Sequence, residues 1–128
     1  MNSILLTSFD VWEAHHVSNS SDDLLEELIN RKVLKEDVHL LRKLPVHFQF
    51  APERTIAKIE EIHPKFVVCC GMAETREYLT VETNGKFFGD VIETEIDVNR
   101  LITDLTITQI SHDAGSFVCN HLYYSVLK

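Results

Sequence analysis

Cys119 occupies a position at which a thiol can become reactive. It follows a strand-like run that ends at Ser111 and a turn of small residues, and it stands near the start of a helical stretch that reaches Tyr124. A helix N-terminus carries a partial positive charge of about half a unit and several unpaired N–H groups. Such an end favours the thiolate over the thiol and can bind an oxyanion. The segment 111–124 is therefore a candidate position for a cysteine nucleophile.

Two other side chains have the chemistry to support such a nucleophile. Arg76 stands in a loop that starts at Gly71, directly after the apolar run 66–70. Glu82 belongs to the run 78–83, which alternates with the two-residue period of a β-strand. A thiolate nucleophile needs a neighbouring base or cation, an orienting carboxylate and donors for the oxyanion. Since a free cysteine has a pKa of about 8.5, the chemistry also requires a histidine partner.

Each of these three residues also fits an ordinary structural role. Free cysteines are more commonly buried core residues than nucleophiles, and Cys119 fits that role. Glu82 fits a solvent-facing or cross-strand carboxylate, and Arg76 fits a surface ion pair. Residue types and spacing alone therefore leave both interpretations open.

The composition excludes several classes of partner. The chain has 128 residues and a net charge of −8, and its acidic and basic residues are interspersed. Nucleic acids and anionic membranes require clustered lysine and arginine, so neither is expected as a partner. No apolar run approaches the roughly 20 residues that span a bilayer. The N-terminus also lacks the basic start and long apolar core of a signal peptide, so we expect a cytoplasmic protein.

The cysteines and histidines do not indicate a metal site or a disulfide framework. There are three cysteines, an odd number, and Cys69 and Cys70 are adjacent, as suits small core residues on opposite faces of a strand. No pair of histidines or cysteines has the spacing of a zinc site. His15 and His16 are neighbours in a polar stretch and fit a solvent-exposed loop. We therefore expect no metal and no cofactor.

Strands and helices alternate along the chain. Strands are predicted at 4–7, 38–44, 66–70, 78–83 and 106–111, and helical spacing predicts helices over 22–29, 52–62, 98–105 and the stretch from 118. The run 66–70 is continuously apolar, as expected for a strand buried on both faces. The carboxylates Asp22, Asp23, Glu26 and Glu27 fit the solvated face of the first helix, and Leu24, Leu25, Leu28 and Ile29 its apolar face. Asn84-Gly85 indicates a turn before a hairpin arm over 86–92. This pattern predicts an α/β sandwich with a mostly parallel sheet.

The stretch around Cys119 closely resembles the nucleophile signature of the pyroglutamyl peptidase I (pyrrolidone carboxyl peptidase) family of cysteine peptidases. The match runs through Ala114-Gly115, Cys119-Asn120 and Tyr124. Three further blocks agree in order and spacing. They are Gly71, Ala73 and Arg76 against the family's G-x-A-x-x-R loop, Leu79–Glu82 against its catalytic-glutamate strand, and Leu5–Asp10 against its first strand and loop.

The resemblance implies a fold, an activity and a set of site residues. The implied fold is a three-layer α/β/α sandwich around a mostly parallel mixed sheet. The implied activity is that of a hydrolase, a thiol protease that removes N-terminal pyroglutamate from peptides through a thioacyl-enzyme. The resemblance also implies a homo-oligomer, because members of the family often assemble in that way. Cys119 matches the nucleophile, Glu82 the acidic triad member and Arg76 a residue near the oxyanion. The residues that fall where the family forms an apolar slot for the lactam ring are Phe9, Trp12, Phe117 and Val118.

The sequence departs from the family in three places. The loop 8–12 lacks the family's glycine and proline, and the segment between Glu82 and Ser111 is much shorter. The family's catalytic histidine follows the cysteine helix on a later strand, and none of the seven histidines matches it. His121 lies only two residues after Cys119, and helical neighbours at that spacing face different sides. His112 precedes the turn and is near enough to approach, although the family does not use that position.

Two functions therefore remain open, besides the weaker option of an α/β domain that shares only the fold. The first is a pyroglutamyl-peptidase-type cysteine peptidase, with residues 1–128 forming a single domain that is C-terminally incomplete relative to the family. This interpretation predicts a histidine on a strand beyond Lys128 in a longer reading frame. The alternative is a catalytically inactive relative that binds a small peptide or a protein. The absent histidine and the lost loop glycine favour that alternative.

Overall fold

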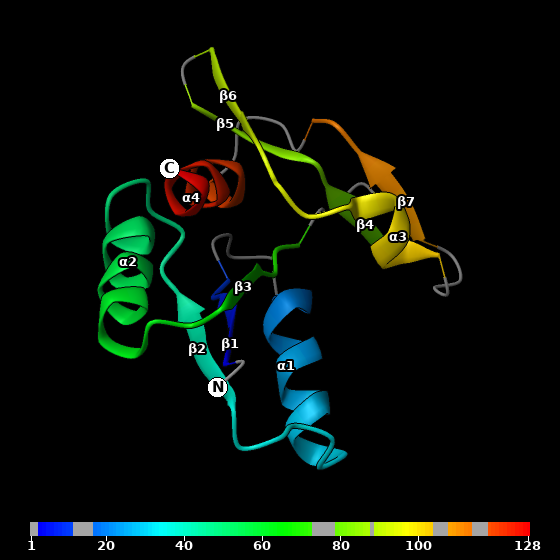
Figure 1. Cartoon of the computed structure of the whole chain (residues 1–128). Helices are drawn as coiled ribbons and strands as arrows, with labels where there is room; N and C mark the ends of the chain where they lie inside the picture. Colours follow the sequence, from blue (N-terminus) through cyan, green and yellow to red (C-terminus); the bar gives the residue numbers. More distant parts are fainter. Residues whose placement is uncertain (1–2, 12–16, 73–78, 88, 104–107, 114–117) are drawn as a thin grey trace. The chain divides into compact units, whose positions relative to one another are not determined.

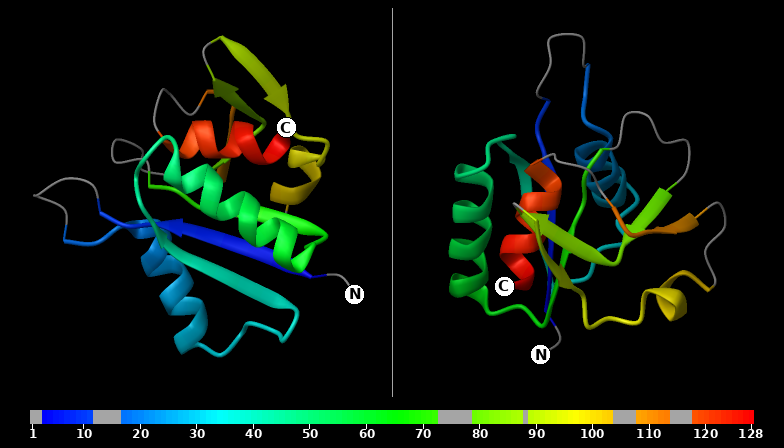
Figure 2. Two further views of the ribbon diagram at one scale, coloured as in Figure 1. Left: turned by 90° about the vertical axis from the view of Figure 1, so that its left-hand side faces the viewer. Right: turned by 90° about the horizontal axis from the view of Figure 1, so that it is seen from above.

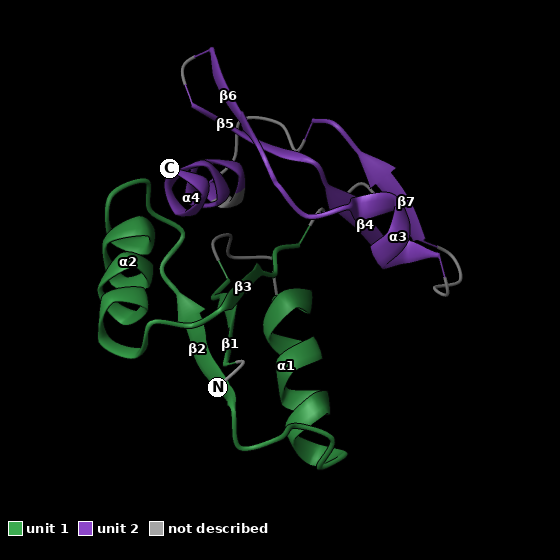
Figure 3. Cartoon of the chain, viewed as in Figure 1, with its two compact units in different colours: residues 1–72 green, residues 73–128 purple. Residues whose placement is uncertain are grey.

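The computed structural model describes residues 3–11, 17–72, 79–87, 89–103, 108–113 and 118–128, and for Cys119 the main chain (Figure 1). The chain divides into two compact units, residues 1–72 and residues 73–128 (Figure 3). Arg76, Trp12 and Phe117, which the sequence analysis assigns to the site, lie outside the described residues. Each unit is described by itself below.

Unit 1 is built around a parallel three-stranded sheet. Its elements are β1 (Ile4–Phe9), α1 (Ser20–Asn30), β2 (Val38–Leu44), α2 (Phe50–Ile62) and β3 (Phe66–Cys69). The strand order is β2-β1-β3, and both pairings of the central strand β1 are parallel. Helices α1 and α2 lie on opposite faces of this sheet (Figures 1 and 2). The α/β class predicted from the sequence is therefore confirmed.

The buried core of unit 1 joins β1 and β2 to α1. Leu5, Leu25 and Leu44 are each exposed by 1% or less. Two predictions for this unit are wrong in detail. The apolar face of α1 is narrower than predicted, because Leu24 and Ile29 are more than 40% exposed. The strand 66–70 was expected to be buried on both faces, whereas β3 lies at the edge of its sheet and Phe66 is 42% exposed.

Unit 2 contains one parallel strand pair and one hairpin. Its elements are β4 (Leu79–Glu82), β5 (Asn84–Phe87), β6 (Asp90–Glu93), α3 (Val98–Ile102), β7 (Thr108–Ser111) and α4 (Val118–Leu127). Strands β4 and β7 pair in parallel, and β5 and β6 form an antiparallel hairpin. The turn predicted at Asn84-Gly85 is wrong, because these two residues begin β5. Gly89, with φ at +82°, lies between the hairpin strands instead.

Among the described residues, no helix has both the length and the apolar composition needed to cross a bilayer. Within the same residues, no group of three or more histidines, cysteines or carboxylates is arranged to hold a metal ion.

Candidate functional site

Glu82 is the last residue of β4 and lies opposite Ser111 of the neighbouring strand β7. The hydroxyl of Thr80 donates to Glu82 Oε1 at 3.5 Å. Thr80 and Glu82 therefore share one side of the strand, as the two-residue alternation predicts. The carboxylate is half-buried at the carboxyl end of a parallel strand, where ligands of α/β sheets gather.

Helix α4 carries Cys119 as its second residue and is bonded to the strand that carries Glu82. The Tyr123 hydroxyl donates to the carbonyl oxygen of Glu82 at 3.1 Å. The backbone N–H of Lys86 donates to Asn120 Oδ1 at 3.0 Å. Unit 2 thus brings the cysteine helix and the glutamate strand together.

Hairpin residues that follow Lys86 also contact α4. The ring of Phe87 lies 4.2 Å from the ring of His121 and 5.7 Å from that of Tyr124, measured between centroids. The Tyr124 hydroxyl donates to Asp90 Oδ2, and this hydrogen bond raises the pKa of the tyrosine above its ordinary value. Helix α4 is therefore held along the hairpin over more than one turn.

His112 follows β7 directly, and its imidazole is engaged by the loop after Glu82. Its Nδ1 lies 2.8 Å from the Thr83 hydroxyl oxygen. Asn84 Nδ2 donates to that same hydroxyl and to the carbonyl oxygen of His112, at 3.0 Å each. Because the Thr83 hydroxyl accepts from Asn84, its own hydrogen can bond to Nδ1 of a neutral imidazole, which then carries its proton on Nε2. The Thr83 hydroxyl therefore holds the Nδ1 side of the His112 ring.

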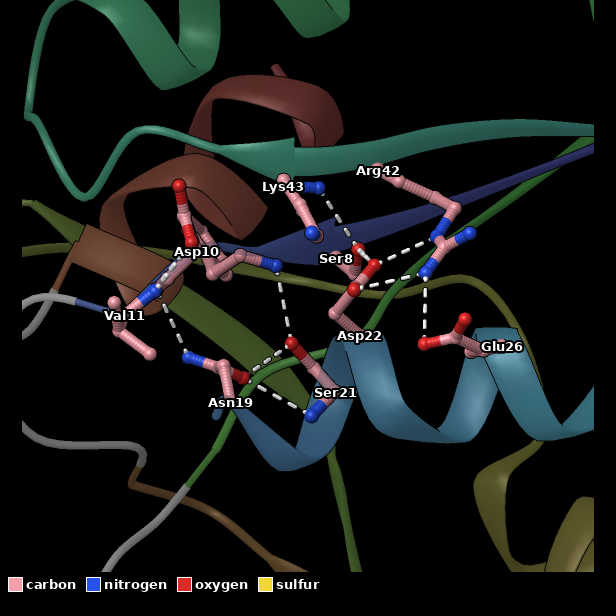
Figure 4. Close-up of polar contacts among 10 residues, drawn as sticks. Ser8, Asp10, Val11, Asn19, Ser21, Asp22, Glu26, Arg42 and Lys43 are labelled. Carbon is pink, nitrogen blue, oxygen red and sulfur yellow. Dashed lines mark hydrogen bonds and ion pairs between the residues drawn. The ribbon is translucent and has the colours of Figure 1, made fainter. Parts of the chain in front are cut away.

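In unit 1, Phe9 ends β1 and is only 3% exposed. Its backbone N–H donates to Ser21 Oγ at 3.0 Å, and Asn19 Nδ2 donates to the carbonyl oxygen of Asp10 at 3.2 Å (Figure 4). Asn19 also caps α1, because its side chain accepts from the N–H of Ser21. The start of α1 thus fixes the backbone that leaves β1.

A partly buried ion pair joins α1 to β2 near this segment (Figure 4). Asp22 accepts from Arg42 Nε at 2.8 Å, from Arg42 Nη2 at 2.9 Å and from the Ser8 hydroxyl at 2.8 Å. The hydrogen bonds from Arg42 hold the pKa of Asp22 below its ordinary value. The prediction that Asp22 belongs to a solvated helix face is therefore wrong, since the residue is only 5% exposed. The available signal was Arg42, a charged residue within the predicted strand 38–44.

The predicted site residues fall into three groups. Glu82, Val118 and Cys119 belong to unit 2, and Val118 is buried at the start of α4 with 6% exposure. Phe9 belongs to unit 1. Arg76, Trp12 and Phe117 lie outside the described residues. Cys69 and Cys70 are both partly buried, and burial raises the pKa of the Cys70 thiol.

Comparisons with known proteins converge on one family. The sequence model described as "Pyroglutamyl peptidase" matches residues 2–91. A pyrrolidone-carboxylate peptidase of Thermoanaerobacter sp. is 29% identical over 152 residues, which cover 98% of this chain and 73% of the relative. A Bacillus cereus protein of the same name is 22% identical, over 99% of this chain and 70% of the relative.

Solved structures give the same α/β fold. The crystal structure of Bacillus amyloliquefaciens pyroglutamyl peptidase I superposes with a TM-score of 0.82 at 19% identity, covering 99% of this chain and 73% of that chain. A variant of the pyrrolidone carboxyl peptidase from Pyrococcus furiosus superposes with a TM-score of 0.79 at 20% identity. That superposition covers 96% of this chain and 71% of the other.

Proposed function

The chain belongs to the pyroglutamyl peptidase family, and from this premise we propose that it removes N-terminal pyroglutamate from peptides with Cys119 as the nucleophile. The observation that carries the proposal is the hydrogen bond from Tyr123 to the Glu82 carbonyl oxygen, which ties the cysteine helix to the glutamate strand. A cysteine peptidase needs its thiol and its acidic residue on elements that hold one another in place. Unit 2 meets that requirement.

In the proposed reaction, the Cys119 sulfur attacks the carbonyl carbon that joins pyroglutamate to the next residue. The C–N bond then breaks, the base gives its proton to the leaving amine, and a thioacyl-enzyme remains. Water hydrolyses this thioester, and the proton that the water loses returns the base to its starting form. Glu82 is proposed as the acidic residue that orients the base.

The position of Cys119 supports its proposed role. It is the second residue of α4, within the turn whose unpaired N–H groups carry the positive end of the helix dipole. That end stabilises a thiolate and the oxyanion that forms on the carbonyl oxygen. Arg76 is proposed as further support for the oxyanion.

The proposed substrate is a peptide that begins with pyroglutamate. Its lactam ring is uncharged, so recognition requires apolar walls and a few hydrogen bonds to the amide. Phe9 and Val118 are both buried, which supports an apolar environment around each of them. The residues proposed for the lactam slot are Phe9, Trp12, Phe117 and Val118.

We propose further that residues 1–128 form one pyroglutamyl-peptidase-like α/β domain. A cytoplasmic location and a homo-oligomer are part of the same proposal, and both rest on the family resemblance.

The alternative is a catalytically inactive relative that binds a small peptide or a protein. The observation that favours it concerns the base. His112 is engaged by the Thr83 hydroxyl at 2.8 Å, and none of the seven histidines in this sequence matches the family's catalytic histidine. Losing one member of a nucleophile–base unit can cost almost as much rate as losing the whole unit.

Hydrolysis of pyroglutamyl-7-amino-4-methylcoumarin distinguishes the two functions. The wild-type chain, Cys119→Ser, Glu82→Gln and Cys70→Ser are compared at equal concentration. The peptidase predicts turnover that falls to background in Cys119→Ser, falls strongly in Glu82→Gln and persists in Cys70→Ser. No turnover by a folded wild-type chain would contradict the peptidase, and saturable binding of a pyroglutamyl dipeptide by calorimetry would then support the alternative.

A further inference from the structure

Helix α4 lies along β5, and side chains from its first turns bind backbone groups next to Glu82 (Figure 1). Asn120 is only 2% exposed, and its Oδ1 accepts from the N–H of Lys86 at 3.0 Å. The Tyr123 hydroxyl donates to the Glu82 carbonyl oxygen at 3.1 Å. Both bonds end on the main chain of the β4–β5 segment.

These two bonds define both the rotation and the axial position of α4. Asn120 and Tyr123 are three residues apart, so they lie on the same face of the helix. A slip of α4 by one turn, about 5.4 Å, would break both bonds, and so would a rotation about its axis. Position 85 must be a glycine for α4 to approach β5 so closely, because a Cβ there would lie 2.3 Å from the Tyr124 nitrogen.

We infer that Asn120 and Tyr123 are positioning residues that hold the Cys119 turn of α4 in one register against the Glu82 strand. The inference rests on the proposed function, in which Cys119 and Glu82 act together. Cys119 directly precedes Asn120, so the bond of Asn120 to Lys86 restrains the turn that bears the thiol. Tyr123 restrains the backbone of Glu82 itself.

The test measures the influence of Glu82 on the Cys119 thiol. Alkylation of Cys119 by iodoacetamide is followed from pH 5 to 10, and peptide mass spectrometry separates it from that of Cys69 and Cys70. Removing the Glu82 charge with Glu82→Gln favours the thiolate, because a nearby negative charge disfavours it. In the wild-type background we expect the alkylation midpoint to fall by about half a pH unit or more.

The midpoint shift that Glu82→Gln causes is then measured again in chains that also carry Tyr123→Phe or Asn120→Ala. In both backgrounds we expect the midpoint shift to fall below half its wild-type size. Ser125→Ala is the matched control, because the Ser125 hydroxyl donates within α4 to the His121 carbonyl oxygen at 3.0 Å, and this variant should keep the full shift. Other charged groups near α4, such as Lys86, Asp90, His112, Asp113 and His121, are the same in each pair and cancel in the difference.

Three results would overturn the inference. They are a full shift that persists in Tyr123→Phe, a shift lost equally in Ser125→Ala, and no shift in the wild-type background. Tyr123→Phe decides the question by itself if Asn120→Ala does not fold, as judged by circular dichroism. General loosening of the chain is recognised by faster alkylation of Cys70, which is partly buried in unit 1. Because the readout is the thiol and not turnover, a chain that hydrolyses no pyroglutamyl amide can still pass this test.

Discussion

A Cβ atom on Gly85 would lie 2.3 Å from the backbone nitrogen of Tyr124 and 2.6 Å from its Cα. No side-chain rotation can relieve these contacts, because the opposing atoms belong to the main chain of α4. Gly85 is therefore required for the close approach of the cysteine helix to β5. The reason is that glycine has no side chain, since its backbone conformation here is open to other residues.

We predict that Gly85→Ala destabilises the chain by about 3 kcal/mol, the upper range for inserting a methyl group into a packed interface. Urea unfolding followed by circular dichroism measures this loss. Gly89→Ala is the control, because no atom of the described residues beyond its chain neighbours lies within 4 Å of the added Cβ, whereas the positive φ opposes it. Its cost should be about 1 kcal/mol. Equal costs for the two variants would contradict the role assigned to Gly85.

The sequence predicted the strands of unit 1 and the order of the elements well. The strand predicted at 38–44, ended by Pro45, coincides with β2, and the apolar run from Phe66 coincides with β3 to within one residue. Such runs are local signals, and a proline ends a strand by removing a backbone donor. The turn predicted at Asn84-Gly85 is wrong because Gly85 serves a non-local contact. Its missing side chain makes room for the backbone of α4.

The candidate site was predicted only in part, for a similar reason. Family resemblance identified the cysteine helix and the glutamate strand, and unit 2 joins them through Tyr123 and Asn120. Neither bond is visible in local spacing, because each joins residues more than 30 positions apart. Asp22 was missed likewise, since its partner Arg42 is 20 positions away.

Asp22→Asn should lower the free energy of unfolding at pH 7 by about 2 kcal/mol, as expected for lost hydrogen bonds to charged groups. Arg42 would keep its charge but lose the buried Asp22 carboxylate, and among the described residues the Glu26 carboxylate, at 3.6 Å, would remain as its ionic partner. Glu27→Gln is the control, because its pair with Arg31 is exposed and should contribute only about 0.4 kcal/mol. Chemical denaturation of the three chains in one buffer makes the comparison. A loss in Asp22→Asn no larger than that in Glu27→Gln would show that the buried pair adds no stability.

The contribution of Asp22 should also depend on pH. Arg42 lowers the pKa of Asp22 in the folded chain relative to the unfolded chain. The stabilisation is therefore complete above the unfolded-state pKa, about 3.9, and is lost as the pH falls below it towards the folded-state pKa. The stability difference between wild type and Asp22→Asn should be constant from pH 6 to 8 and shrink below about pH 4. A difference that stays constant down to pH 3 would refute the linkage.

Two fully buried threonines should respond in opposite directions to substitution by valine. The hydroxyl of Thr7 in β1 has no hydrogen-bond partner among the described residues, whereas that of Thr55 donates to the Ala51 carbonyl oxygen at 2.8 Å. Thr7→Val removes an unsatisfied buried hydroxyl and keeps the β-branched shape, so it should stabilise the chain by about 1 kcal/mol. Thr55→Val removes a made hydrogen bond and should destabilise it by about 1 kcal/mol. Thermal unfolding at pH 7 measures both, and a destabilised Thr7→Val would mean that this hydroxyl is bonded in solution.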